Sequence, residues 1–160
     1  MTTPRRKPPV ARSAARLGAV QALYQMDLAG TDVGEVLAQF SSRAAGDAFD
    51  EGQCGPADFG FLKDVVDGVV REQRAIDVAV NSLLDKGWPL ARLDATLRAI
   101  LRAAAYEIMF MKKVPARVAI NEYLDVAHAF FDEQEPKFLN GILNTLARHH
   151  RPDEFRVSPS

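Results

Sequence analysis

The chain has 160 residues, of which 48% are hydrophobic and 26% are charged. This length favours one domain or two small sub-bundles, and the composition is typical of a packed globular protein rather than a disordered one. The lone cysteine, Cys54, excludes an internal disulfide and a cysteine-based zinc site. No apolar run of about 18 residues occurs, and none follows the basic start, so we expect a cytoplasmic protein without membrane contact.

Charge is distributed unevenly along the chain, although the net charge is only −1. The first 26 residues carry five bases and no acid, whereas the remainder carries 15 bases and 21 acids. The five bases are Arg5, Arg6, Lys7, Arg12 and Arg16. Prolines punctuate residues 1–11, which predicts a flexible basic arm on an acidic body. Such an arm attracts phosphate groups; the alternative is a solubilising tail.

Apolar residues recur every three or four positions, which predicts an all-α fold, a bundle of about six to seven helices without strands. The first predicted helix spans residues 12–29. A short second helix has its apolar residues within 33–40, a long third helix within 59–83, and a fourth helix within 97–111. Pro115 opens a fifth helix with apolar residues within 120–131, and the last helix starts at Glu135-Pro136 and has apolar residues within 138–146. The segment 46–58 is rich in Gly, Asp and Pro and predicts a loop. Residues 12–151 are therefore the predicted helical domain, followed by a loose tail at 152–160.

The residue types that carry catalysis do not form a constellation in this sequence. His128 stands alone on a predicted helix, and His149 and His150 are neighbours whose side chains point about 100° apart. Cys54 lies in an acidic loop, which opposes thiolate formation. We therefore expect no enzyme activity, no metal and no cofactor.

The start of the last predicted helix combines a cation, a ring and an amide in Lys137, Phe138 and Asn140. Pro136 predicts the first turn there, so free backbone N–H groups would lie beside these side chains. A nucleotide could then place its phosphate on Lys137 and stack its base on Phe138. The alternative is a core position for Phe138, because Phe138, Ile142 and Leu146 are spaced by four.

Four ordered blocks resemble a known family. They are Ala15-Arg16 with A-V-Q-A-L-Y at 19–24, L-R-A-I-L-R at 97–102, Tyr106-Glu107-Ile108 followed by V-P-x-x-V-A-I-N-E at 114–122, and K-F-L-N-G-I-L at 137–143. Over about residues 10–152 the chain is similar to the NusB family of bacterial transcription antitermination factors.

The resemblance implies a fold of two helical sub-bundles. It also implies that the protein binds the boxA element of RNA together with the ribosomal protein NusE. This binding would take place in an RNA polymerase antitermination complex that supports rRNA transcription. It implies RNA contacts at Arg12, Arg16, Lys137, Phe138 and Asn140, and less directly at Arg5, Arg6 and Lys7. It also implies partner contacts at Tyr24, Leu97 and Arg98. The sequence departs from the family at Ser13-Ala14, where an arginine run is common, and at Leu97, where some members have an acid.

Two other functions remain open at this stage. One is a helical adaptor that binds only proteins and carries the arm as a solvated tail. The other is a relative of the NusB-like domain of an rRNA cytosine methyltransferase, although 160 residues leave no room for the α/β cofactor domain of that enzyme. The sequence also leaves open whether the chain forms a homodimer.

Overall fold

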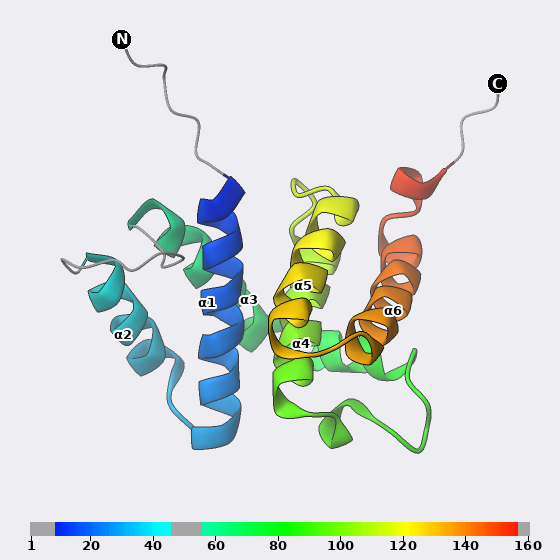
Figure 1. The fold of residues 1–160 in the computed structure, drawn as a ribbon, viewed down its shortest axis with the longest axis horizontal. Coiled ribbons are helices and arrows are strands. Elements are labelled where there is room, and N and C mark those ends of the chain that lie inside the picture. Colours follow the sequence, from blue (N-terminus) through cyan, green and yellow to red (C-terminus); the bar gives the residue numbers. More distant parts are fainter. Residues whose placement is uncertain (1–8, 46–55, 157–160) are drawn as a thin grey trace, which may run out of the picture. The chain divides into compact units, whose positions relative to one another are not determined.

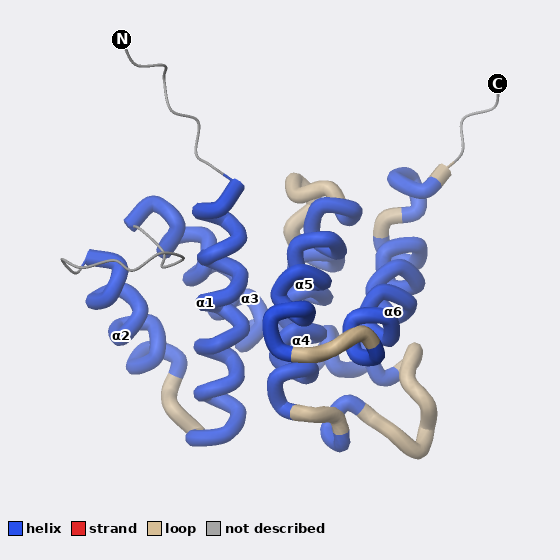
Figure 2. The backbone as a smooth tube through the Cα atoms, in the orientation of Figure 1, coloured by secondary structure: helices blue, strands red, loops and turns tan. Residues whose placement is uncertain are grey.

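A computed structural model describes residues 9–45 and 56–156, and all regular structure within these ranges is helical (Figures 1 and 2). The elements are α1 (Pro9–Ala29), α2 (Val33–Ala45), α3 (Pro56–Asn81), the 3₁₀ helix η1 (Leu90–Arg92), α4 (Ala95–Phe110), α5 (Ala116–Phe130), α6 (Gln134–His150) and the 3₁₀ helix η2 (Pro152–Phe155). The predicted all-α fold is confirmed.

The chain divides into two compact units, Met1–Asp67 and Gly68–Ser160. The first contains α1, α2 and the start of α3; the second contains the rest of α3, both 3₁₀ helices and α4 to α6. The boundary thus falls inside α3, which also has a non-helical residue, Glu72, with φ −106° and ψ 15°. Two units agree with the two sub-bundles that the family resemblance implies.

The first unit is held together by small and branched apolar side chains. In α1, Ala15, Ala19 and Ala22 are fully buried, which lets neighbouring helices approach closely. Gly30 ends α1 with a φ of 69°, a conformation that glycine adopts without steric cost. Asp32 then caps α2, because its carboxylate accepts a hydrogen bond from the Gly34 N–H at 3.0 Å.

The second unit is built around α4, which packs against both α5 and α6. Ten of its 16 residues are buried, so α4 is a central helix rather than a surface one. One of the buried residues is polar: Glu107 is fully inaccessible, and its carboxylate accepts a hydrogen bond from the Tyr123 hydroxyl on α5 at 2.5 Å. At the N-terminus of α4, Asp94 accepts hydrogen bonds from the N–H groups of Thr96 and Leu97.

Several predicted helix ends shift in the structure. The helices α1 and α3 begin at Pro9 and Pro56, each three residues earlier than predicted. Proline is favoured in the first helical turn, because its missing N–H has no partner there and its φ is already helical. Most of the predicted loop at 46–58, Cys54 included, lies outside the described residues.

The end of the described chain is ordered where a loose tail was expected. Pro152–Phe155 form η2, and Arg151 before it is only 5% exposed. The Arg151 guanidinium donates hydrogen bonds to the carbonyl groups of Ile108 and Val114. The expectation of a loose segment is therefore wrong for residues 152–155, because a buried arginine fixes this segment to the end of α4.

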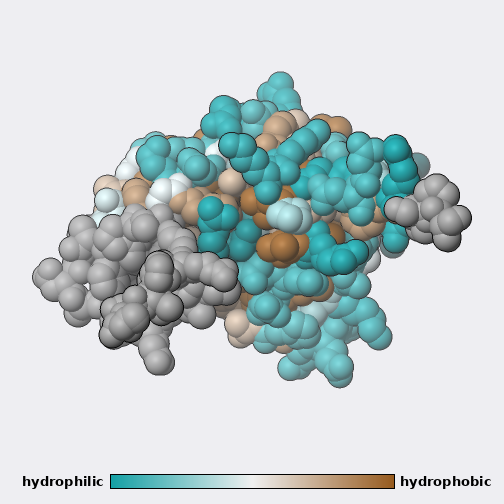
Figure 3. Space-filling model, turned by 90° about the horizontal axis from the view of Figure 1, so that it is seen from above, coloured by the Kyte–Doolittle hydropathy of each residue, from teal (hydrophilic) through white to brown (hydrophobic). Residues whose placement is uncertain are grey.

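Hydrophilic residues cover most of the described surface that Figure 3 shows, and hydrophobic residues appear there in small patches. Among the described helices, none combines the length and the apolar character that crossing a membrane requires.

Candidate nucleic-acid interface

The arginines of α1 meet an aromatic ring of α3 within the first unit. The guanidinium carbon of Arg12 lies 4.1 Å from the centroid of the Phe61 ring, and that of Arg16 lies 4.9 Å from the same centroid. Both distances are within the range of a cation–π interaction. Arg5, Arg6 and Lys7, the remaining bases of the predicted arm, lie outside the described residues.

The two arginines differ in their access to solvent. Arg12 is exposed, whereas Arg16 is only 2% exposed. The sequence predicted that both project from one helix face, and they do share a face, but that face is turned toward Phe61. Arg12 is therefore the described arginine of this pair that a phosphate can reach directly.

At the start of α6, the predicted arrangement of backbone N–H groups is wrong. The helix begins at Gln134, one residue before the predicted start at Glu135-Pro136, and the Lys137 N–H donates a hydrogen bond to the Glu133 carbonyl at 3.2 Å. Pro136 occupies the third position of the helix, where its missing N–H still costs no hydrogen bond. The amide of Lys137 is thus engaged within the helix, and anchoring of a phosphate there would depend on its side chain.

The ring of Phe138 lies outside the core. It is 39% exposed, and the buried face of α6 consists of Pro136, Leu139, Leu143, Leu146 and Ala147. Spacings of three and four place these five residues on one stripe and leave Phe138 at its edge. The core alternative for Phe138 is therefore wrong, because the neighbouring Leu139 takes the core position.

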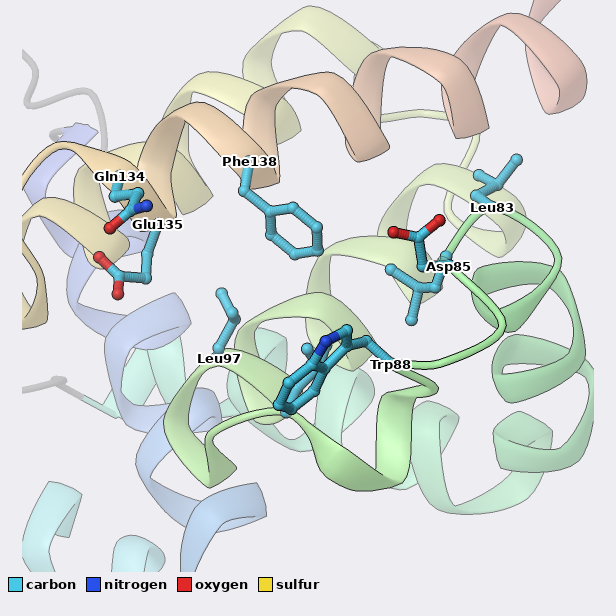
Figure 4. Close-up of a pocket in the computed structure, with 9 residues that line it drawn as sticks. Leu83, Asp85, Trp88, Leu97, Gln134, Glu135 and Phe138 are labelled. Atoms are coloured by element: carbon cyan, nitrogen blue, oxygen red, sulfur yellow. The ribbon is translucent and has the colours of Figure 1, made fainter.

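Phe138 lines a pocket of about 730 Å³ in the second unit. The other lining residues come from the segment between α3 and α4, from the start of α4 and from the start of α6: Leu83, Leu84, Asp85, Trp88, Leu93, Leu97, Gln134 and Glu135. Figure 4 shows the Phe138 ring pointing away from the α6 ribbon and toward the segment that carries Asp85 and Trp88. Two aromatic rings with two carboxylates offer a base stacking surface and hydrogen-bond acceptors.

Lys137 and Asn140 are exposed but do not line this pocket. The Asn144 side-chain amide donates to the backbone carbonyl and to the side-chain oxygen of Asn140, both at 2.9 Å. The structure thus brings Phe138 to the pocket and leaves Lys137 and Asn140 on the adjoining surface of α6.

The three predicted partner contacts have different surroundings. Tyr24 is 39% exposed on α1, so part of its ring is accessible to a partner. Leu97 is 5% exposed and lines the pocket. Arg98 donates hydrogen bonds to the carbonyls of Leu93, at 2.7 Å, and Ala91, at 3.3 Å, so its guanidinium holds the turn before α4. Tyr24 belongs to the first unit, and the other two belong to the second.

Two aromatic residues of these surfaces were not identified from the sequence. Trp88 is 55% exposed, and the Arg92 guanidinium carbon lies 4.6 Å from the centroid of its ring. The spacing of Phe61, Val65 and Val69 would have placed Phe61 on the buried stripe.

Within the described ranges, no group of three or more His, Cys, Asp and Glu side chains could hold a metal ion.

Sequence comparison finds a protein family and individual proteins that are similar to this chain. The NusB family model matches residues 13–148. The transcription antitermination protein NusB of Rhodopseudomonas palustris is 51% identical over 147 residues, which are 92% of this chain and 84% of that protein. NusB of a Bradyrhizobium species is 50% identical over 143 residues, 89% of this chain and 85% of that protein.

Solved NusB structures are also similar to this chain in fold. The T. maritima NusB structure has a TM-score of 0.75 and 28% identity, and the match covers 98% of this chain and 100% of that one. A crystal structure of the antitermination factors NusB and NusE in complex with double-stranded RNA has a TM-score of 0.74 and 25% identity. That match covers 89% of this chain and 99% of the matched chain.

The helices, the arginine pair and the exposed rings define an all-helical protein with candidate binding surfaces in both units. The chain belongs to the NusB family.

Proposed function

We propose that this protein is a transcription antitermination factor that binds boxA-type RNA together with NusE. In this role it joins the RNA polymerase antitermination complex and supports rRNA transcription as a binding protein rather than an enzyme. The observation that carries the proposal is membership of the NusB family over residues 13–148, since the solved complex that matches this chain contains NusB, NusE and RNA.

The chemistry of the first unit supports RNA binding. Arg12 is exposed at the start of α1, directly after a segment that holds Arg5, Arg6 and Lys7. The remainder of the chain has 15 bases against 21 acids, so the excess of positive charge is concentrated in this part of the sequence. Phosphate contacts are proposed for Arg12 and these three bases.

The chemistry of the second unit supports contact with bases. Phe138 presents its ring to a pocket that also contains Trp88. Proteins that bind single-stranded RNA commonly stack bases on such rings. Lys137 and Asn140 lie on the adjoining surface of α6 and are proposed to contact the backbone of the same RNA.

Contact with NusE is proposed at Tyr24. Tyr24 offers an exposed ring with a hydroxyl group, a side chain that is favoured at protein interfaces. Leu97 is mostly buried, so its contribution is to shape the pocket wall. Arg98 is proposed to maintain the turn before α4, since its donors already bind backbone carbonyls.

The test is binding of boxA RNA to the full chain, with and without NusE, against a scrambled RNA of equal length. We expect tighter binding of boxA and a further gain when NusE is present. Equal affinity for both RNAs would contradict sequence recognition. Binding of NusE without any binding of RNA would instead support the protein-only adaptor.

A variant pair tests the arginine contact. Arg12→Ala should flatten the dependence of log affinity on log salt by about 0.7, the slope expected for one phosphate contact with a single strand. Arg74→Ala removes the same charge from an exposed position on α3 and should leave the slope unchanged.

A further inference from the structure

The buried ring of Phe61 contacts the exposed side chain of Arg12 and restrains it. Phe61 is 8% exposed on α3, and the Arg12 guanidinium carbon lies 4.1 Å from its ring centroid. Packing of the first unit fixes the ring, because Leu62 and Val65 beside it are fully buried. The long arginine side chain has no such constraint of its own.

The hydrogen-bond donors of Arg12 remain available in this arrangement. Arg12 has neither a hydrogen bond nor an ion pair with any described residue, and its contact with Phe61 is to a ring that offers no strong acceptor. A guanidinium group has five N–H donors in a planar fork that matches a phosphate. The contact with Phe61 thus restrains the cation, and no described residue occupies the donors that a phosphate would need.

Arg16 supports the same ring from within the unit. It follows Arg12 by one helical turn, and its guanidinium carbon lies 4.9 Å from the Phe61 centroid although the residue is only 2% exposed. The two arginines therefore have different tasks: Arg12 is the outer residue and Arg16 the inner one.

We propose that Phe61 is a positioning residue for RNA binding, and that it orders Arg12 for a phosphate of the RNA backbone while Arg16 packs against the same ring. The inference rests on the proposed function, because it assigns an organiser to the RNA contact of α1. Ordering a flexible side chain before binding reduces the entropy lost when the complex forms, so Phe61 raises RNA affinity without touching RNA.

A double-mutant cycle on the full chain tests this assignment. Affinity for boxA RNA is measured for the wild type, Phe61→Leu, Arg12→Ala and the double variant. Phe61→Leu should lower affinity about three- to ten-fold, the usual cost of ordering one long side chain on binding. In the Arg12→Ala background the same substitution should change affinity less than about two-fold, because the side chain to be ordered is gone.

Two matched variants separate positioning from stability. Phe61→Tyr keeps the ring and should retain wild-type affinity. Val36→Ala truncates a fully buried residue of α2 in the same unit, so it should lower the melting temperature while RNA affinity of the folded protein is unchanged. Where Phe61→Leu is too unstable to assay, Phe61→Met replaces it in the cycle, because the unbranched methionine side chain adapts to an irregular gap.

A spectroscopic measurement tests the geometry without RNA. A ring 4.1 Å from the guanidinium should shift the Arg12 δ-proton resonances upfield in the free protein, and the shift should disappear in Phe61→Leu. Absence of the shift in the wild type would overturn the proposed ordering.

The outcomes distinguish this inference from the function on which it rests. If Arg12→Ala leaves RNA affinity and the salt slope unchanged, the proposed RNA contact of α1 fails. If Arg12→Ala weakens binding but Phe61→Leu does not, or weakens it equally in both backgrounds, the RNA contact stands and the role of Phe61 is overturned.

Discussion

The ring of Tyr106 lies directly against the backbone of Gly68. A Cβ atom built on Gly68 would be 2.0 Å from Cζ of that ring, far inside van der Waals contact. The Tyr106 hydroxyl accepts a hydrogen bond from Arg71 at 3.0 Å, and its ring stacks on Phe110 with centroids 5.5 Å apart. Contacts on several sides thus fix the ring, and α3 and α4 can approach this closely only where α3 has no side chain.

Gly68→Ala should therefore destabilise the protein. In an exposed helix, alanine would be favoured over glycine by about 1 kcal/mol. Here the added methyl group forces the ring or a helix to move, which costs about 1–3 kcal/mol or more. We expect a net loss of about 1 kcal/mol or more, measured by urea denaturation.

Gly60→Ala is the matched control, since it makes the same change on the same helix. A Cβ on Gly60 has no atom within 4 Å, so this variant should be neutral or slightly more stable. A Gly68→Ala protein as stable as Gly60→Ala would contradict the close approach of Tyr106.

The contact between Tyr106 and Gly68 illustrates which features of the fold can be predicted from the sequence and which cannot. Helix periodicity identifies α3 and α4, because it depends on neighbours along the chain. It does not tell which glycine faces another helix, since Gly60 and Gly68 look alike in sequence. Likewise, nothing near Glu72 marks the distortion of α3.

The candidate site shows the same division between local and tertiary information. The sequence identified Arg12, Arg16 and Phe138, but it could not tell which are exposed. Spacings of three and four suit both Phe138 and Leu139, and only the packing of α6 decides that Leu139 is buried. In the same way, Arg16 looks like an exposed cation until Phe61 of α3 is placed beside it.

Arg151 connects the end of the described chain to the turn between α4 and α5. Arg151→Met should reduce the free energy of unfolding by about 3 kcal/mol, because buried carbonyl groups of Ile108 and Val114 lose their donor. Thermal or urea denaturation measures this loss. Arg156→Met is the control: Arg156 pairs with Asp153 at 2.8 Å in an exposed position, and its loss should have almost no effect.

Protonation of Glu154 makes the free energy of unfolding depend on pH in the acid range. Partial burial alone would raise the pKa of this carboxyl, but a hydrogen bond from the Ala116 N–H and the hydrogen bond and charge of Arg151 outweigh that effect and lower its pKa. The unfolded chain therefore takes up this proton at a higher pH than the folded protein does. The contribution of Glu154 is complete above the ordinary carboxyl pKa of about 4.3 and is lost as pH falls through the lowered pKa of the folded state.

The measurement is the free energy of unfolding between about pH 6 and 3, in the wild type and in Glu154→Gln. The variant should be less stable than the wild type at pH 6, and the difference should shrink as pH falls. Asp153→Asn, at an exposed neighbouring position, should leave the slope of the wild type unchanged. A constant gap between Glu154→Gln and the wild type at all pH values would argue against this carboxylate as the titrating group.

Phe138 and Leu139 are adjacent on α6 and are expected to affect different properties. Phe138→Ala should lower RNA affinity by about 1–3 kcal/mol, the usual effect of losing a stacking surface for one base. Its effect on stability should be small, because the ring is 39% exposed and lies at the edge of the buried stripe. Leu139→Ala should do the opposite, since Leu139 is fully buried and its truncation costs about 2–5 kcal/mol of stability. RNA titrations below both melting transitions, together with denaturation curves for both variants, separate the two effects. Loss of stability in Phe138→Ala with unchanged RNA affinity would remove Phe138 from the proposed interface and leave the pocket beside Trp88 without its proposed ligand.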